Sequence, residues 1–256
     1  MPIDVGDGVN SETEMSTDIS IVIPAYNEAG KLEKAVHKTA DFMMTTHYSF
    51  EIIIAEDGST DGTSTIASAL AEKYPYVRHF HRDSRLGKGL VLTKAFGISR
   101  GEILISMDVD LSTELRFLKP LIESIREGYD FATGSRMLPQ SRVERSSTRH
   151  ITSIMYNLAV RLVLNSRIWD HQCGFKAYKR KSLFNVLYKV KAKHWFWDTE
   201  LLVLASRSGY RIKEIPVVWR GGETSKVHVL PDALKMGVQI VELWLRLKAK
   251  PHNLKV

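Results

Sequence analysis

The chain has 256 residues, 44% of them hydrophobic, and a net charge of +7, which is enough apolar material to bury the core of one large domain. Its single cysteine, Cys173, excludes an internal disulfide framework. No apolar run reaches the roughly 18 residues of a membrane-spanning helix, and no basic and apolar leader opens the chain, so we expect neither a transmembrane segment nor a signal peptide.

The charge is unevenly distributed. Residues 1–18 contain five acidic residues and no lysine or arginine, which predicts a disordered acidic tail. Without that tail, residues 19–256 carry a net charge of +12. This excess indicates an anionic partner, which from charge alone is a nucleotide phosphate, an anionic lipid or a nucleic acid.

Strands and helices alternate along the first half of the chain. Strands are predicted at 19–24, 50–55 and 77–80 and in the apolar run after Gly101, with a helix after each of the first three. The first strand is expected to end at Pro24, because proline cannot donate to a central ladder. This alternation predicts an α/β fold with a doubly wound, mostly parallel sheet flanked by helices.

Polar residues follow each of these four strands. The carboxyl ends of parallel strands share one edge of a sheet, where ligands bind, so these residues should converge. Two carboxylates separated by one residue would repel each other unless a cation lay between them, and Mg²⁺ or Mn²⁺ suits such oxygen ligands. A single Asp-x-Asp is also common in ordinary turns. The residues concerned are Asn27 and Glu28, Glu56 and Asp57, Arg85 and Lys88, and Asp108 and Asp110.

The common mononucleotide and dinucleotide fingerprints are absent. The blocks at 22–28, 56–63, 86–89 and 108–110 instead resemble, in order and spacing, the family 2 glycosyltransferases of GT-A fold, a Rossmann-like architecture. The resemblance implies that the first two blocks hold the nucleoside of a nucleotide-sugar and that Asp108 and Asp110 hold the metal. Lys88 would meet the phosphates, or is a solvated loop lysine. The cofactor-binding residues implied are Pro24, Ala25, Tyr26, Glu28, Glu56, Asp57, Lys88, Asp108, Val109 and Asp110.

The second half of the chain contains a basic loop at 136–149, which is either a solvated loop or a phosphate-binding surface. The helix that follows at 151–164 is apolar nearly all round, so it lies in the core or half-sunk in lipid. The cluster at 170–173 lacks the spacing of a zinc site. Blocks at 170–176, 194–200 and 218–227 resemble the polyprenyl-phosphate sugar synthases, and most closely the dolichyl-phosphate glucosyltransferases.

That resemblance implies an inverting, metal-dependent transfer of a hexose to dolichyl or polyprenyl phosphate on the cytoplasmic face of a membrane. Glucose from UDP-glucose is the first expectation, then N-acetylglucosamine, then mannose from GDP-mannose. Ser112 stands where mannose-type relatives often have a metal-binding glutamine. A phosphate acceptor, with a second pKa of about 6, needs cations to hold it rather than a base to activate it. The candidates are Arg136, Arg142, Arg145, Arg149 and Lys176.

Asp198 and Glu200 leave two interpretations open. Asp198 is either the N-cap of the apolar helix after it or a general base. We therefore count Asp108, Asp110, Arg136 and Asp198 as candidate catalytic residues. Rival functions are a soluble transferase acting on a saccharide or protein hydroxyl, which would need Asp198 or Glu200, and a non-catalytic scaffold for a membrane protein.

The C-terminal region, 229–256, is predicted to be an amphipathic basic helix and tail. Such a helix packs on the protein or lies on a membrane surface. The predicted domain is thus residues 19–228, with a nucleotide-sugar half at 19–135 and an acceptor half at 136–228. Basic amphipathic segments suggest a membrane surface or a membrane-protein partner that supplies an anchor, and the lack of interleaved aromatics argues against nucleic acid.

Overall fold

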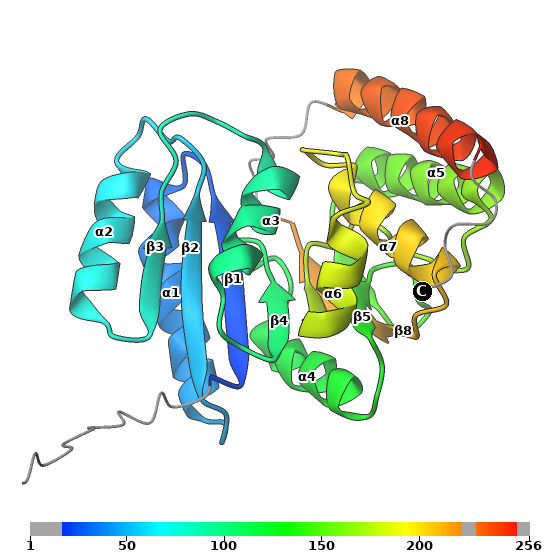
Figure 1. Ribbon diagram of the computed structural model, residues 1–256. Coiled ribbons are helices and arrows are strands. Elements are labelled where there is room, and N and C mark those ends of the chain that lie inside the picture. Colours follow the sequence, from blue (N-terminus) through cyan, green and yellow to red (C-terminus); the bar gives the residue numbers. More distant parts are fainter. Residues whose placement is uncertain (1–16, 222–228, 250–256) are drawn as a thin grey trace, which may run out of the picture.

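The first half of the chain forms a parallel sheet. The computed structural model of the protein describes residues 17–221 and 229–249. Four parallel strands pair in the order β3-β2-β1-β4 (Figure 1). Their bounds are Ile19–Ala25 for β1, Phe50–Glu56 for β2, Val77–Phe80 for β3 and Ile103–Ser106 for β4.

Three later strands extend this sheet to seven. β7 (Lys176–Lys179) pairs antiparallel with both β4 and β5 (Phe131–Ser135), and β8 (Ile212–Pro216) pairs parallel with β5. A separate parallel pair joins β6 (Arg142–Glu144) to β9 (Val218–Arg220). The predicted α/β fold with a mostly parallel sheet is therefore confirmed, with β7 as the antiparallel exception.

Helices cover both faces of the sheet. Strand residues alternate between two cores, so Ile21 and Ile23 pack against α1, α2 and α4, whereas Val22 packs on the side of α3, α5, α6, α7 and α8. The predicted inner face of α1 is fully buried. The helices are α1 (Ala29–Met44), α2 (Thr63–Lys73), α3 (Lys88–Ile98), α4 (Leu118–Arg126), α5 (Ser147–Leu164), α6 (Arg180–Leu187), α7 (Trp197–Arg207) and α8 (Val229–Ala249), with a short 3₁₀-helix at Leu115–Phe117.

Pro24 does not end the first strand, contrary to the prediction. β1 continues through Ala25, which pairs with Glu56 of β2. The ladder between β1 and β4 stops earlier, at Val22 and Ser106, and the Val22 carbonyl accepts the Met107 N–H on that side. Pro24, two residues later, faces the same side, where β4 has already ended. Its missing N–H therefore breaks no ladder hydrogen bond.

α5 differs from expectation, whereas α8 follows one of the two alternatives predicted for it, which is packing on the protein. α5 begins at Ser147, not residue 151, and is neither wholly core nor wholly surface, because Val160 and Leu164 are buried and Leu162 is exposed. α8 packs beside α5 (Figure 1). Among the described residues, no helix is both long and apolar enough to cross a membrane. The predictions for residues 1–16, 222–228 and 250–256 lie outside the described residues.

Candidate active site

The strand ends converge at one edge, as predicted. Asp57, just beyond β2, donates its N–H to the Ala25 carbonyl at the end of β1. Its carboxylate accepts the N–H groups of Leu86 and Gly87 at 2.6 and 2.9 Å, at the start of α3. Gly87 has φ of +99°, which glycine adopts without strain. Asp57 thus connects the loops that follow β1, β2 and β3, and these loops together form one wall of the site.

The proposed nucleoside residues lie along that wall. The Arg85 guanidinium lies 3.9 Å from the ring centroid of Tyr26. The Glu28 N–H donates to Thr63 Oγ1 at 2.8 Å. The backbone here is strained, since Asn27 has φ of +51°. The guanidinium therefore makes a cation–π contact that holds the loops of Tyr26 and Arg85 together.

Glu56, next to Asp57 in the chain, has other partners in the strand-end loops. It is fully buried, accepts the Ser59 N–H, and its Oε2 lies 2.6 Å from His81 Nδ1. His79 completes a group of three side chains whose ligand atoms lie within 4.8 Å of one another. Glu56 thus joins the loops after β2 and β3, and its contact with a nucleotide stays a prediction.

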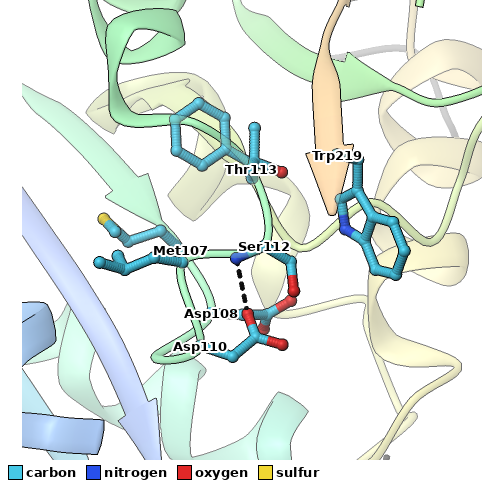
Figure 2. Close-up of a pocket in the computed structure, with 8 residues that line it drawn as sticks. Met107, Asp108, Asp110, Ser112, Thr113 and Trp219 are labelled. Atoms are coloured by element: carbon cyan, nitrogen blue, oxygen red, sulfur yellow. Dashed lines mark hydrogen bonds between the residues drawn. The ribbon is translucent and has the colours of Figure 1, made fainter. Parts of the chain in front are cut away.

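Asp108 and Asp110 line one pocket beyond β4 (Figure 2). Asp110 is exposed, and its Oδ1 accepts the Ser112 N–H at 2.9 Å across the left-handed residue Leu111. Val109 between them is buried in the core, so its side chain does not line the pocket. The other lining residues are Met107, Leu111, Ser112, Thr113, Phe175 and Trp219.

The two carboxylates suit a divalent cation. The Asp108 carboxylate packs against Gly174, and a Cβ at position 174 would overlap it. Asp108 can therefore lie here only because residue 174 is a glycine. Asp108 and Asp110 offer hard oxygen ligands in the same pocket, which is the donor set that Mg²⁺ and Mn²⁺ prefer. The residues present therefore fit the predicted metal.

Two lysines alternate with two carboxylates behind the pocket. Lys88 Nζ lies 2.6 Å from Asp108 Oδ1 and 4.0 Å from Asp198 Oδ2, and Lys176 Nζ lies 2.8 Å from Asp198 Oδ1. Burial alone would lower the pKa of Lys88, but Asp108 and Asp198 raise it well above its usual range. Burial would raise the pKa of Asp108, yet Lys88 holds it below its usual value. Both groups stay charged at neutral pH.

Arg136 is oriented by Asp170. Its Nε and Nη2 donate to the two carboxylate oxygens at 2.7 and 2.9 Å, and its backbone N–H donates to Oδ2 at 2.9 Å. Asp170 is fully buried, which would raise its pKa, but Arg136 holds that pKa far below its usual range. This bidentate pair fixes the guanidinium beside the pocket.

Trp219 connects the arginines to the pocket. The guanidinium carbons of Arg136 and Arg145 lie 5.7 and 5.8 Å from its ring centroid, and its side chain lines the pocket (Figure 2). Burial and the neighbouring Arg136 lower the pKa of Arg145 to about 10, so it remains a cation at neutral pH. Two cations therefore lie beside Trp219, which lines the same pocket as the two carboxylates.

The other proposed phosphate-binding residues lie elsewhere. Arg142 is exposed on β6, and Arg149 lies in the first turn of α5. Lys176 is fully buried, where it pairs with Asp198 and donates to the Cys173 carbonyl. The neighbouring His171 contacts Asn157 and Ser166, and burial lowers its pKa to about 3. Asp170 to Cys173 thus form a packed polar layer under Arg136.

Asp198 is not an N-cap. Phe196 caps α7, Asp198 lies inside the first turn, and it makes no capping hydrogen bond. The helix begins earlier than the apolar pattern suggested, so Asp198 turns toward the two lysines. Glu200 is buried away from them, where it accepts the N–H groups of Lys191 and Ala192 and pairs with Arg246 of α8 at 2.7 Å.

Three site residues were not singled out from sequence. They are Asp170, which orients Arg136, Gly174, which makes room for Asp108, and Trp219, which lines the pocket. The signal available for them was their position in the blocks at 170–176 and 218–227. Only the fold reveals which residues they contact, since Asp170 lies 34 residues from Arg136.

Comparison with known proteins identifies the family. The model of glycosyl transferase family 2 matches residues 20–187. The chain belongs to this family. It is 43% identical to glycosyltransferase AglD of Haloferax volcanii over 94% of this chain, but spans only 39% of that relative's length. It is also 28% identical to the dolichyl-phosphate beta-glucosyltransferase of Saccharomyces cerevisiae, over 87% of this chain and 73% of that protein.

A solved structure shares the GT-A fold of this glycosyltransferase. Glucosyl-3-phosphoglycerate synthase from Mycobacterium tuberculosis, in complex with Mn²⁺, UDP-glucose and phosphoglyceric acid, superposes with a TM-score of 0.68 over 93% of this chain and 82% of that one. The sequences are 19% identical. The predicted GT-A architecture is therefore confirmed.

Proposed function

We propose that this family 2 glycosyltransferase transfers glucose from UDP-glucose to a polyprenyl phosphate of the dolichyl type. The observation that carries the proposal is the separation of charges around one pocket. The carboxylates of Asp108 and Asp110 lie on one side, and Arg136 and Arg145 lie beside Trp219 on the other. Carboxylates suit the metal of a nucleotide-sugar, and fixed guanidinium groups suit a second phosphate.

The donor half of the proposal rests on the wall built by Asp57. Tyr26 and Arg85 would stack with the base, and the loop fixed by Asp57 would shape the ribose site. Asp108 and Asp110 would hold Mg²⁺ or Mn²⁺, which when bound supplies positive charge to the nucleotide diphosphate. The Mn²⁺ and UDP-glucose bound by the structural neighbour support this choice of donor.

Lys88 contributes to the departure of the nucleotide. It lies on the donor side at the start of α3 and pairs with Asp108. A diphosphate bound at this carboxylate would bring its oxygens within reach of the same ammonium group. Lys88 would then stabilise the negative charge that grows on UDP as the bond to the sugar breaks.

The acceptor half needs no general base. One oxygen of the ionised lipid phosphate attacks the anomeric carbon, the bond from that carbon to the UDP oxygen breaks, and its electron pair leaves with UDP. Attack opposite the leaving group inverts the anomeric centre. Arg136, fixed by Asp170, and Arg145 would hold and orient the phosphate. Asp198 would act as the counterion that positions Lys88 and Lys176.

The test is transfer from radiolabelled UDP-glucose, UDP-N-acetylglucosamine and GDP-mannose to polyprenyl phosphate in detergent. We expect label in the organic phase from UDP-glucose only, with Mn²⁺ or Mg²⁺ and not with EDTA. Asp110→Asn should lower kcat/KM by roughly a hundredfold or more, because it removes an exposed ligand with little structural role. The matched control is Asp83→Asn, an almost fully exposed aspartate outside the pocket. Equal turnover by Asp110→Asn would overturn the metal assignment.

The second candidate is transfer to a saccharide hydroxyl, which the dolichyl-phosphate names of the relatives do not favour. It requires a base, and the candidate is Asp198, which lies 4.0 Å from Lys88 and 2.8 Å from Lys176. Transfer to soluble sugars with no label in the polyprenyl phosphate fraction would favour this reaction over the proposed one.

A further inference from the structure

The outer side of α5 is apolar and uncovered. Leu162 is 73% exposed, Met155 60% and Ile151 59%. Ile154 and Leu158 are also exposed and lie three and seven residues after Ile151, which places them on the same side of the helix, and Val163 is exposed at the edge of that side. The opposite side, with Val160 and Leu164, is buried in the core. This helix therefore has a core side and a second, solvent-facing apolar side.

α8 repeats this arrangement beside α5 (Figure 1). Met236, Ile240, Leu243 and Leu247 are buried, whereas Val238, Val241 and Leu245 are 51–55% exposed. Together the six exposed residues of α5 and the three of α8 form what we call the α5–α8 face. Isolated exposed aliphatic residues are ordinary, but nine on two adjoining helices mark an interaction surface.

The charges around the α5–α8 face are mostly positive. α5 contains no aspartate or glutamate, and it carries Arg149 and Arg161. Among residues 235–249 of α8, whose side chains the structure describes, Lys235 and Lys248 are exposed and Glu242 is the one exposed acid. Two tryptophans lie under cations, with Arg161 3.7 Å from the ring centroid of Trp169 and Lys248 4.0 Å from that of Trp244. Tryptophan beside a basic group is typical of the headgroup region of a bilayer.

We propose that the α5–α8 face docks on the surface of an anionic phospholipid bilayer, with both helices lying in the plane of the interface. The face offers aliphatic side chains rimmed by cations, which complement acyl chains and acidic headgroups without requiring a matching protein shape. Neither helix is apolar enough to span the bilayer, so the contact is peripheral.

Docking in this way would bring the proposed acceptor to the pocket, and this step rests on the proposed function. α5 starts two residues after Arg145, which lies over Trp219 at the pocket. From the other helix, Met236 of α8 contacts Gln172, with Nε2 and Sδ 4.0 Å apart, in the segment that orients Arg136. Both helices that carry the face therefore adjoin the Arg136 and Arg145 side of the site, so a lipid phosphate could enter while its chain stays in the bilayer.

The experiment is flotation of the full chain with vesicles of phosphatidylcholine alone or with phosphatidylglycerol, without donor, metal or polyprenyl phosphate. We expect binding to the anionic vesicles, weakened by salt. Met155→Gln/Leu162→Gln should reduce the partition coefficient roughly ten- to a hundredfold, because both side chains would enter the acyl region. The matched control is Met44→Gln/Ile98→Gln, which removes two exposed aliphatic residues outside the face.

Several outcomes overturn the proposal. The first is that the unaltered chain does not bind vesicles, and the second is that the control variant loses as much vesicle binding as Met155→Gln/Leu162→Gln. The third is a dimer in analytical ultracentrifugation that Met155→Gln/Leu162→Gln dissociates, because a second copy of the chain would then cover the face. Unchanged UDP binding by the variant shows that it is folded. Transfer in detergent separates the two proposals, since the variant should keep transfer there and lose it with vesicles. Failure of transfer in detergent by every form, with vesicle binding intact, would count against the proposed function alone.

Discussion

Gly174 determines where the Asp108 carboxylate lies. A Cβ at this position would overlap the carboxylate, so Gly174→Ala forces Asp108 out of the pocket. We expect this variant to weaken Mn²⁺-dependent UDP binding at least roughly tenfold, because a ligand displaced by about an ångström no longer matches the metal. Isothermal titration calorimetry with and without EDTA measures the effect.

The matched control is Gly97→Ala on α3. No atom lies within 4 Å of its added Cβ, so this change should leave binding intact and raise helix stability by about 0.5–1 kcal/mol. If Gly174→Ala binds UDP and Mn²⁺ as the unaltered chain does, the carboxylate of Asp108 does not hold the metal.

At the residue scale, the sequence predicted positions better than contacts. Asp57, Lys88 and Asp108 could be placed together because each follows a strand of the same sheet, and they do meet at one edge. The burial of Lys176 and the pairing of Arg136 with Asp170 could not be predicted. They depend on how β7 and the loop before it pack under the pocket, and no local pattern carries that information.

At the scale of elements, α8 is held to the domain by a charge pair. Arg246 donates to Glu200 at 2.7 Å, and Glu200 is otherwise buried. Arg246→Gln leaves that carboxylate without its cation, so we expect unfolding free energy to fall by about 1–3 kcal/mol. Denaturant unfolding measures the loss, while kcat/KM in detergent should change by less than about threefold.

Glu200→Gln is the companion variant, because its amide oxygen still accepts the N–H groups of Lys191 and Ala192. It removes the charge that a general base would need. Retained transfer agrees with a structural role for Glu200. A loss of roughly 10²–10⁴ would favour the hydroxyl-acceptor reaction, in which a carboxylate takes the acceptor proton.

Element types were easier to predict than their bounds. The helical spacing of apolar residues in α1 and the apolar runs of β2 and β4 correctly predicted the parallel half of the sheet. β7 was not predicted, because four residues with a lysine at each end do not resemble a buried strand. α7 starts before its apolar pattern, at Trp197, and this shift moved Asp198 from a cap to the interior of the first turn.

At the scale of the whole molecule, the pocket joins two parts of the chain that are far apart in sequence. Asp108 and Asp110 follow the parallel strand β4, whereas Phe175 precedes the antiparallel strand β7 and Trp219 lies on β9. The wall built by Asp57, which we propose holds the nucleoside, comes from the ends of β1 and β2 and the start of α3. A nucleotide bound here would contact elements from the first and last parts of the described chain, so its binding energy should stabilise the native state as a whole.

Saturating UDP with Mn²⁺ should therefore raise the unfolding temperature. At one hundred times the dissociation constant the gain is about 2.7 kcal/mol, or roughly 5–10 °C for a chain of this size. Differential scanning calorimetry measures the shift. EDTA should abolish most of this shift in unfolding temperature. Asp110→Asn with Mn²⁺ should show the same small shift as the unaltered chain with EDTA, because the Asp110 carboxylate would hold the metal, and through it the nucleotide, beside β4. A shift of equal size with EDTA would mean that UDP binds without the metal, and the role of Asp108 and Asp110 would then have to be sought in the acceptor step.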